Sequence, residues 1–99
     1  MIITICSSMQ NRMTIEEIVR DLSLRGHVVL SPVTTPPSIY TDDELKVLKE
    51  IHLQRIILCD AIYVIDNNIG ESVNAEIAYA VSLSKTVYFH SKHEGKFLV

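Results

Sequence analysis

The sequence predicts an α/β protein in which helices cover both faces of a parallel β-sheet. Two observations support this prediction. Four short apolar runs alternate with three longer segments in which apolar residues recur at helical spacing. Repeated strand–helix–strand order is typical of parallel sheets joined by right-handed crossovers. The chain has 99 residues, so we expect one domain, residues 1–99, with no room for a second.

The first half of the chain contains two expected strands and one expected helix. Residues 2–6 (IITIC) are apolar and mostly β-branched, as in a strand buried on both faces. Thr14 and Glu17 have the spacing of a capping box, so the first helix should begin at Thr14 and end before Gly26. Residues 27–31 (HVVLS) form the second expected strand, and the proline-rich stretch after it predicts a loop.

The second half repeats the alternation. Thr41 and Glu44 form a second capping-box pattern at the start of the second helix. Ser72 is the expected N-cap of the third helix. The remaining expected strands are residues 61–66 (AIYVID), residues 86–90 (TVYFH) and a short edge strand at residues 96–99 (KFLV). These elements predict a Rossmann- or flavodoxin-like three-layer sandwich with strand order 2-1-3-4.

This strand order predicts where a ligand binds. The chain reverses direction across the sheet between the first and third strands, and ligands of such sheets lie beyond the carboxyl ends of the strands at that point. Two loops border the expected crevice: residues 7–13 after the first strand, and residues 66–71 after the third. We therefore expect functional side chains in these two loops.

The composition argues against several classes of function. A net charge of −3 does not suit a phosphate-backbone partner, so we expect no nucleic-acid binding. The apolar runs are too short for a membrane span, which needs about 20 residues.

The N-terminus lacks a basic leader, so a cytoplasmic protein with reduced cysteines is expected. Neither nucleotide-binding glycine motif is present, so no cofactor is expected. Uncovered helix faces on so small a sheet favour a homodimer or larger assembly.

Cys6 and Arg12 have the spacing of a phosphatase loop, in which a low-pKa thiolate attacks phosphorus. Wrapping such a loop around phosphate usually requires glycine, and SSMQN has none. The predicted helix start at Thr14 also lies beyond the loop. The sequence therefore favours a buried thiol at a strand end, and cysteine-dependent phosphoryl transfer remains a third functional hypothesis.

Glu76 is the main candidate for a catalytic residue. It lies in the second turn of the third expected helix, at the edge of the face that packs on the sheet. The positive end of that helix favours an ionised carboxylate, and the hydroxyls of Ser72 and Tyr79 flank it. Gly70 and its turn let a ligand approach the backbone. Such a carboxylate suits attack on an anomeric carbon, although a boundary glutamate that bends outward to water has the same sequence pattern.

Residues 60–89, DAIYVIDNNIGESVNAEIAYAVSLSKTVYF, resemble the nucleoside 2-deoxyribosyltransferase-like proteins. Within that family the chain is most similar to a small bacterial branch. Proteins of that branch have a Cys-Gly-Ser-Thr-Arg type loop after the first strand, followed by LH..KI..aD.i.vi and IGES...EI.YA. The corresponding stretches here are CSSMQNR, IHLQRIILCDAIYVID and IGESVNAEIAYA.

The resemblance implies roles for individual residues. Glu76 would be the nucleophile that forms a glycosyl-enzyme, and Ser72 would lie near the sugar or a phosphate. The other ligand contacts that the resemblance implies are Ser7, Ser8, Gln10 and Asp66. It thus implies a nucleoside or nucleotide substrate and either transfer or hydrolysis of its N-glycosidic bond.

Other features leave the function open. The candidates for a general acid are weak: Asp42, Asp43 and Asp66. A non-catalytic module that binds a nucleotide-like ligand is therefore the alternative hypothesis. His52 interrupts the apolar stripe of the second helix, and we expect it to pack below the crevice. His90, His93 and Glu94 are loosely spaced, so no metal site is expected.

Overall fold

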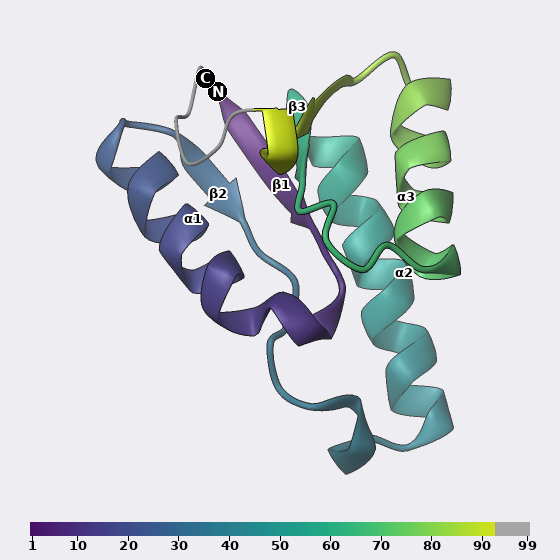
Figure 1. Ribbon diagram of the computed structural model, residues 1–99. Coiled ribbons are helices and arrows are strands. Elements are labelled where there is room, and N and C mark those ends of the chain that lie inside the picture. The colour runs from purple at the N-terminus through teal and green to yellow at the C-terminus, as the bar shows by residue number, and fades with distance from the viewer. Residues whose placement is uncertain (93–99) are drawn as a thin grey trace.

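A computed structural model describes residues 1–92 and contains four strands and three α-helices (Figure 1). The strands are β1 (Ile2–Cys6), β2 (Val28–Leu30), β3 (Ala61–Val64) and β4 (Thr86–Phe89). The helices are α1 (Arg12–Leu24), α2 (Asp42–Leu58) and α3 (Glu71–Ser82). Short 3₁₀ helices are η1 (Met9–Asn11), η2 (Pro37–Ile39) and η3 (His90–Lys92). The expected strand at residues 96–99 lies outside the described residues, as do His93 and Glu94.

The four strands form one parallel sheet in the order β2-β1-β3-β4, which confirms the predicted fold class. Ile3 of β1 pairs with Val29 on one side and Ala61 on the other, so β1 and β3 are the central strands. All four residues of β3 are buried, as expected for a strand covered on both faces. No helix in the described part of the chain is long and apolar enough to span a membrane.

Alternate side chains of β1 point into two separate cores, one on each face of the sheet. Ile3 and Ile5 pack against α1, whereas Cys6 packs against α2 and α3. Figure 1 shows α1 on one side of the sheet and α2 with α3 on the other. The buried α1 residues are Ile15, Ile18 and Leu22; those opposite include Ile56, Val73 and Ala80. Cys6 therefore faces the groove between two helices.

The predicted start of the first helix is wrong. Helix α1 begins at Arg12 with Asn11 at its N-cap, and Thr14 lies inside the helix. Asn11 is buried, and its amide nitrogen donates to the backbone oxygen of Asn67 at 2.8 Å. This contact between the loops after β1 and β3 holds the chain in place, and the local Thr14–Glu17 pattern cannot reveal it.

The other two helix starts gave different outcomes. The Thr41–Glu44 capping box is confirmed: each residue's backbone N–H donates to the other's side chain, at 2.9 Å and 3.1 Å. Helix α3 begins earlier than predicted, at Glu71, with Gly70 rather than Ser72 at the N-cap. Ser72 is thus inside the first turn, where its hydroxyl turns along the helix instead of capping it.

Helix α2 projects beyond the sheet. The connection from β2 spans residues 31–41, so α2 starts well past the carboxyl ends of the strands (Figure 1). His52 lies ten residues after Asp42, which is about 15 Å along a helix that rises 1.5 Å per residue. The middle of α2, and not its first turn, therefore lies level with the ends of the central strands.

Candidate active site

A cavity of about 250 Å³ lies at the carboxyl edge of the sheet, where α2, α3 and the loops after β1 and β2 meet. Its apolar wall consists of Met9, Pro32, Val33, Pro37, Leu45, Leu48, Leu53 and Ala75. Its polar wall consists of Ser7, Thr35, Tyr40, Lys49, His52, Arg55, Ser72 and Glu76. A mostly apolar hollow with a few convergent polar groups suits a small organic ligand.

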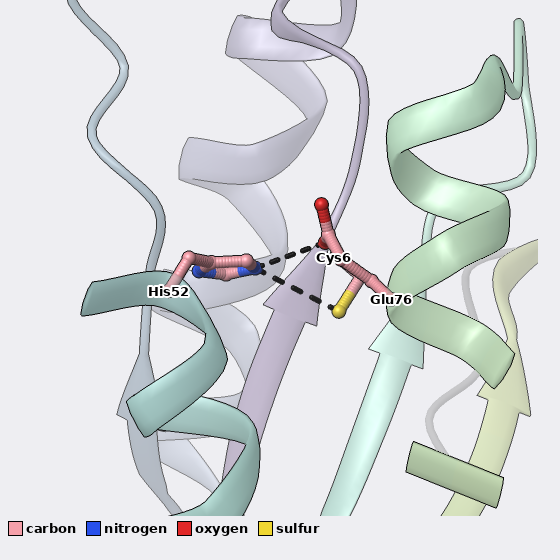
Figure 2. A group of neighbouring side chains, drawn as sticks. All are labelled: Cys6, His52 and Glu76. Atoms are coloured by element: carbon pink, nitrogen blue, oxygen red, sulfur yellow. Dashed lines mark hydrogen bonds and ion pairs between the residues drawn. The ribbon is translucent and has the colours of Figure 1, made fainter. Parts of the chain in front are cut away.

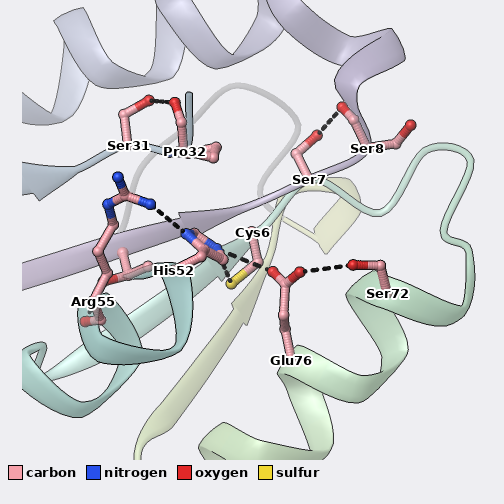
Figure 3. Close-up of polar contacts among 10 residues, drawn as sticks. Cys6, Ser7, Ser8, Ser31, Pro32, His52, Arg55, Ser72 and Glu76 are labelled. Carbon is pink, nitrogen blue, oxygen red and sulfur yellow. Dashed lines mark hydrogen bonds and ion pairs between the residues drawn. The ribbon is translucent and has the colours of Figure 1, made fainter. Parts of the chain in front are cut away.

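Glu76 presents its two carboxylate oxygens to different surroundings (Figure 3). The hydroxyl of Ser72, one turn earlier in α3, donates to Oε2 at 3.2 Å. Oε1 is shielded from solvent and lies 3.1 Å from Nε2 of His52. The side chain as a whole is only 15% exposed. Oε2 is therefore the oxygen that can meet a ligand in the cavity.

His52 lies in the candidate site, and the expectation that it packs below the crevice is wrong. Its Nε2 is 3.8 Å from Sγ of Cys6 as well as 3.1 Å from Glu76 (Figure 2). The overhang of α2 explains the difference, because ten residues of helix bring His52 just level with the end of β1. Strand β1, helix α2 and helix α3 thus each contribute one side chain to a buried cluster.

Arg55 fixes the tautomer of His52. Its guanidinium nitrogen lies 3.2 Å from Nδ1 of His52 (Figure 3), and a guanidinium can only donate. Nδ1 therefore accepts, and a neutral His52 carries its proton on Nε2, which faces Cys6 and Glu76. The Nε2–Oε1 separation is short, but the ring N–H is not aligned with that oxygen. Within residues 1–92, Oε1 has no hydrogen-bond donor.

Cys6 is fully buried at the end of β1. Burial raises the pKa of its thiol far above the ordinary value of 9.0, and the neighbouring Glu76 carboxylate raises that pKa further. The thiol is therefore protonated near neutral pH. A phosphatase nucleophile requires the opposite shift, so these surroundings do not favour phosphoryl transfer by Cys6.

The free energy of unfolding should fall as the pH rises above about 9. The unfolded Cys6 thiol ionises near its ordinary pKa of 9.0, whereas the folded thiol keeps its proton. Burial also raises the pKa of Tyr63 from 10.0 to about 12, with Asp66 adding to the shift. Above its unfolded pKa, each group lowers the free energy of unfolding by up to about 1.4 kcal/mol per pH unit.

Urea unfolding at pH 8, 9 and 10 measures this decline. Cys6→Ser should flatten the decline between pH 9 and 10, and an unchanged slope would contradict the assignment.

The other predicted ligand contacts are Ser7, Ser8, Gln10, Gly70 and Tyr79, and only some of them lie in the cavity wall. Ser7 lines the cavity. Ser8 accepts a hydrogen bond from the backbone N–H of Gln10 at 3.3 Å within η1, and neither residue belongs to the wall that residues 1–92 form. The carbonyl of Gly70 accepts from the N–H of Asn74 at 3.1 Å. Tyr79, in α3, packs against the core between the helix and the sheet and does not belong to the cavity wall as described for residues 1–92.

Asp66 holds the chain after β4. Its carboxylate accepts from the backbone N–H of Ser91 at 2.9 Å and from the Ser91 hydroxyl. Burial alone would raise the pKa of Asp66, but these two bonds lower it below its ordinary value. Asp42 and Asp43 lie exposed in the first turn of α2. None of the three acids considered as proton donors is in the cavity wall as described for residues 1–92.

The sequence interpretation missed His52, Arg55 and Lys49 as cavity residues. One signal was available. His52 interrupts an apolar stripe, and Arg55 follows three residues later on the same helix face, a spacing at which side chains meet. That pair indicates an organised polar site, but only the overhang of α2 brings it beside Glu76.

Comparisons with known proteins agree with this fold. No protein-family model matches the sequence, and no curated protein matches it. Among solved structures, the 2-deoxyribosyltransferase of the psychrotolerant bacterium Bacillus psychrosaccharolyticus, described as a biocatalyst for nucleoside synthesis, superposes with a TM-score of 0.67. The similarity covers 90% of this chain and 71% of that one, at 21% sequence identity. The chain therefore has the fold of a nucleoside 2-deoxyribosyltransferase, as the resemblance of residues 60–89 implied.

Proposed function

We propose that the protein breaks or exchanges the N-glycosidic bond of a nucleoside or nucleotide, with Glu76 as the nucleophile. One observation carries the proposal: a carboxylate with one shielded oxygen turns its other oxygen toward a ligand-sized cavity. The similarity to a 2-deoxyribosyltransferase supports the choice of substrate class, because that enzyme has the same fold. Fold alone does not define activity, so the argument depends on the site.

The reaction has two steps. Oε2 of Glu76 forms a bond to C1′ of the sugar while the C1′–N bond breaks. The electron pair of that bond leaves with the base, which takes up a proton from solvent. Water or a second base then attacks C1′ and gives up a proton to solvent, the ester bond to Glu76 breaks, and the carboxylate is regenerated. Attack by a charged oxygen suits the positive charge that develops on the sugar ring.

The neighbours of Glu76 have distinct tasks in this proposal. The Ser72 hydroxyl orients Oε2, and the second turn of α3 places the carboxylate near the positive end of the helix dipole. His52 restrains the other oxygen as a positioning residue. The apolar walls contributed by Pro32 and Leu48 suit the flat faces of a base.

Ser72→Ala should lower kcat about three- to tenfold, because one hydrogen bond to the nucleophile is worth about 0.5–1.5 kcal/mol. The matched control is Ser82→Ala at the other end of α3, where the hydroxyl donates to the backbone oxygen of Tyr79. Steady-state base release measures both variants. Equal rates for Ser72→Ala and wild type would show that this bond does not orient the nucleophile.

A substrate panel tests the proposal. The purified protein is incubated with ribo- and deoxyribonucleosides and their 5′-monophosphates, with and without a second free base, and free base is followed by chromatography. The monophosphates are included because Lys49 and Arg55 bring positive charge to the cavity wall. Release or exchange of base is the expected result. Thermal stabilisation by these compounds without turnover would instead support the non-catalytic binding module.

A further inference from the structure

The buried cluster of Cys6, His52 and Glu76 has the composition of a metal site. Each residue offers one donor atom, a sulfur, an imidazole nitrogen and a carboxylate oxygen, and these three atoms lie within 4.8 Å of one another. The donors come from β1, α2 and α3 (Figure 2). His52 and Glu76 line the cavity, and the buried Cys6 lies beside them. Thiolate, imidazole and carboxylate are the ligands that Zn²⁺ takes in proteins.

Two of the three donor separations are close to those within one face of a zinc tetrahedron. Bond lengths of 2.3 Å to sulfur and about 2.0–2.2 Å to nitrogen and oxygen place tetrahedral ligands about 3.4–3.6 Å apart. The observed separations are 3.8 Å from Sγ to Nε2 and 3.1 Å from Nε2 to Oε1. The third separation, from Sγ to the Glu76 carboxylate, is no more than 4.8 Å, so the sulfur and the carboxylate would move toward each other when an ion binds.

A second observation also indicates a cation. Oε1 of Glu76 is buried and has no well-aligned hydrogen bond in the described part of the chain, although Nε2 of His52 lies 3.1 Å away and the Cys6 thiol is a neighbour of the carboxylate. An unsatisfied buried oxygen requires an explanation, and an ion is one of the usual ones. We propose that Cys6, His52 and Glu76 bind a Zn²⁺ ion, with water from the cavity in the fourth position.

Binding has a defined proton balance. The Cys6 thiol must lose its proton to become a ligand, so one proton leaves to solvent for each ion bound. His52 ligates through Nε2, and its ring proton moves to Nδ1. Arg55 must then turn away from Nδ1, because two donors cannot face each other.

The proposal goes beyond the glycosidic reaction and does not depend on it. Zn²⁺ on Oε1 would withdraw electron density from the Glu76 carboxylate and draw the side chain toward the inner end of the cavity. A bound ion would therefore inhibit base release, and chelators would restore it.

Metal titration of the full chain tests the site. Protein freed of metal with a chelator is titrated with Co²⁺ and then with Zn²⁺ in competition with a chromophoric chelator. One equivalent of Co²⁺ should give a near-ultraviolet thiolate-to-cobalt band that Zn²⁺ abolishes, together with release of one proton. Absence of this band in the folded wild-type protein overturns the proposal, whatever the variants do.

Two cysteine variants locate the ion. Cys6→Ser should weaken Zn²⁺ binding about 100-fold or more, beyond the range of second-shell changes, and should remove the charge-transfer band. Cys59→Ser is the matched control, because Cys59 is also buried but bonds to the backbone oxygen of Ile56 outside the cluster. Equal losses in both variants would contradict a site at Cys6.

Arg55→Gln tests the histidine tautomer. A glutamine side-chain oxygen can accept the Nδ1 proton that ligation requires, so this variant should bind Zn²⁺ several-fold more tightly than wild type. Weaker binding would overturn the assigned role of His52. These measurements need no substrate. A negative result for the metal site therefore does not count against the proposed glycosidic activity, and a negative result for that activity does not count against the metal site.

Discussion

Glu76→Gln is expected to abolish base release, lowering kcat by about 10³-fold or more, as for other nucleophile replacements. The neutral amide lacks the negative charge that makes the carboxylate oxygen a nucleophile, and it cannot form an ester with C1′. The change preserves the size of the side chain and leaves Ser72 able to donate to its oxygen. The affinity for an unreactive nucleoside analogue should therefore change little, and turnover assays with isothermal titration separate the two effects.

The matched control is Glu71→Gln in the same helix. Glu71 is exposed in the first turn of α3 and does not line the cavity that residues 1–92 form. The Glu71→Gln variant removes the same charge from the same helix end as Glu76→Gln. Because Glu71 does not line the cavity, this variant should retain wild-type turnover. If both variants lose activity equally, helix electrostatics and not nucleophilic attack explains the loss. If neither loses activity, Glu76 is not the nucleophile.

The sequence patterns that were predicted correctly are local ones. The β-branched run in Ile2–Cys6 and the Thr41–Glu44 capping box depend on neighbouring residues, and both are confirmed. The order 2-1-3-4 follows from alternating strands and helices with right-handed crossovers. The closeness of Ser72 to Glu76 was also predictable, because residues four apart share a helix face.

The errors concern contacts between distant segments. Asn11 stands at the N-cap position of α1 without a side-chain cap, and its side chain bonds instead to Asn67 in another loop. Nothing near Thr14 indicates that bond. His52 meets Glu76 because the connection at residues 31–41 lets α2 overhang the sheet. The length of this loop sets how far α2 extends past the carboxyl ends of the strands, and the helical periodicity of the sequence does not predict that distance. The catalytic candidate was thus accessible from sequence, but its histidine neighbour was not.

Successive side chains of β1 point to opposite faces of the sheet, so the residues that stabilise the core against α1 differ from those beside the candidate site. Ile5 points into the core against α1, whereas the next residue, Cys6, points into the core against α2 and α3 on the other face. A change at Ile5 should therefore alter stability without touching the Glu76 cluster.

Ile5→Ala is expected to lower the free energy of unfolding by about 2–5 kcal/mol, because it leaves a cavity around a fully buried side chain. Urea unfolding measures the loss. The matched control is Val28→Ala on edge strand β2, where the side chain is 58% exposed and the change should stay within about 0.5 kcal/mol.

The same variant also tests whether the two faces are independent. Base release by the folded fraction of Ile5→Ala, assayed well below its unfolding midpoint, should match wild type. The cluster depends on the opposite face of β1 and on α2 and α3, and none of these contacts includes Ile5. A folded Ile5→Ala protein with impaired turnover would show that the core against α1 positions Cys6 and its neighbours through the strand backbone. The site would then be a property of the whole sheet and not of one face.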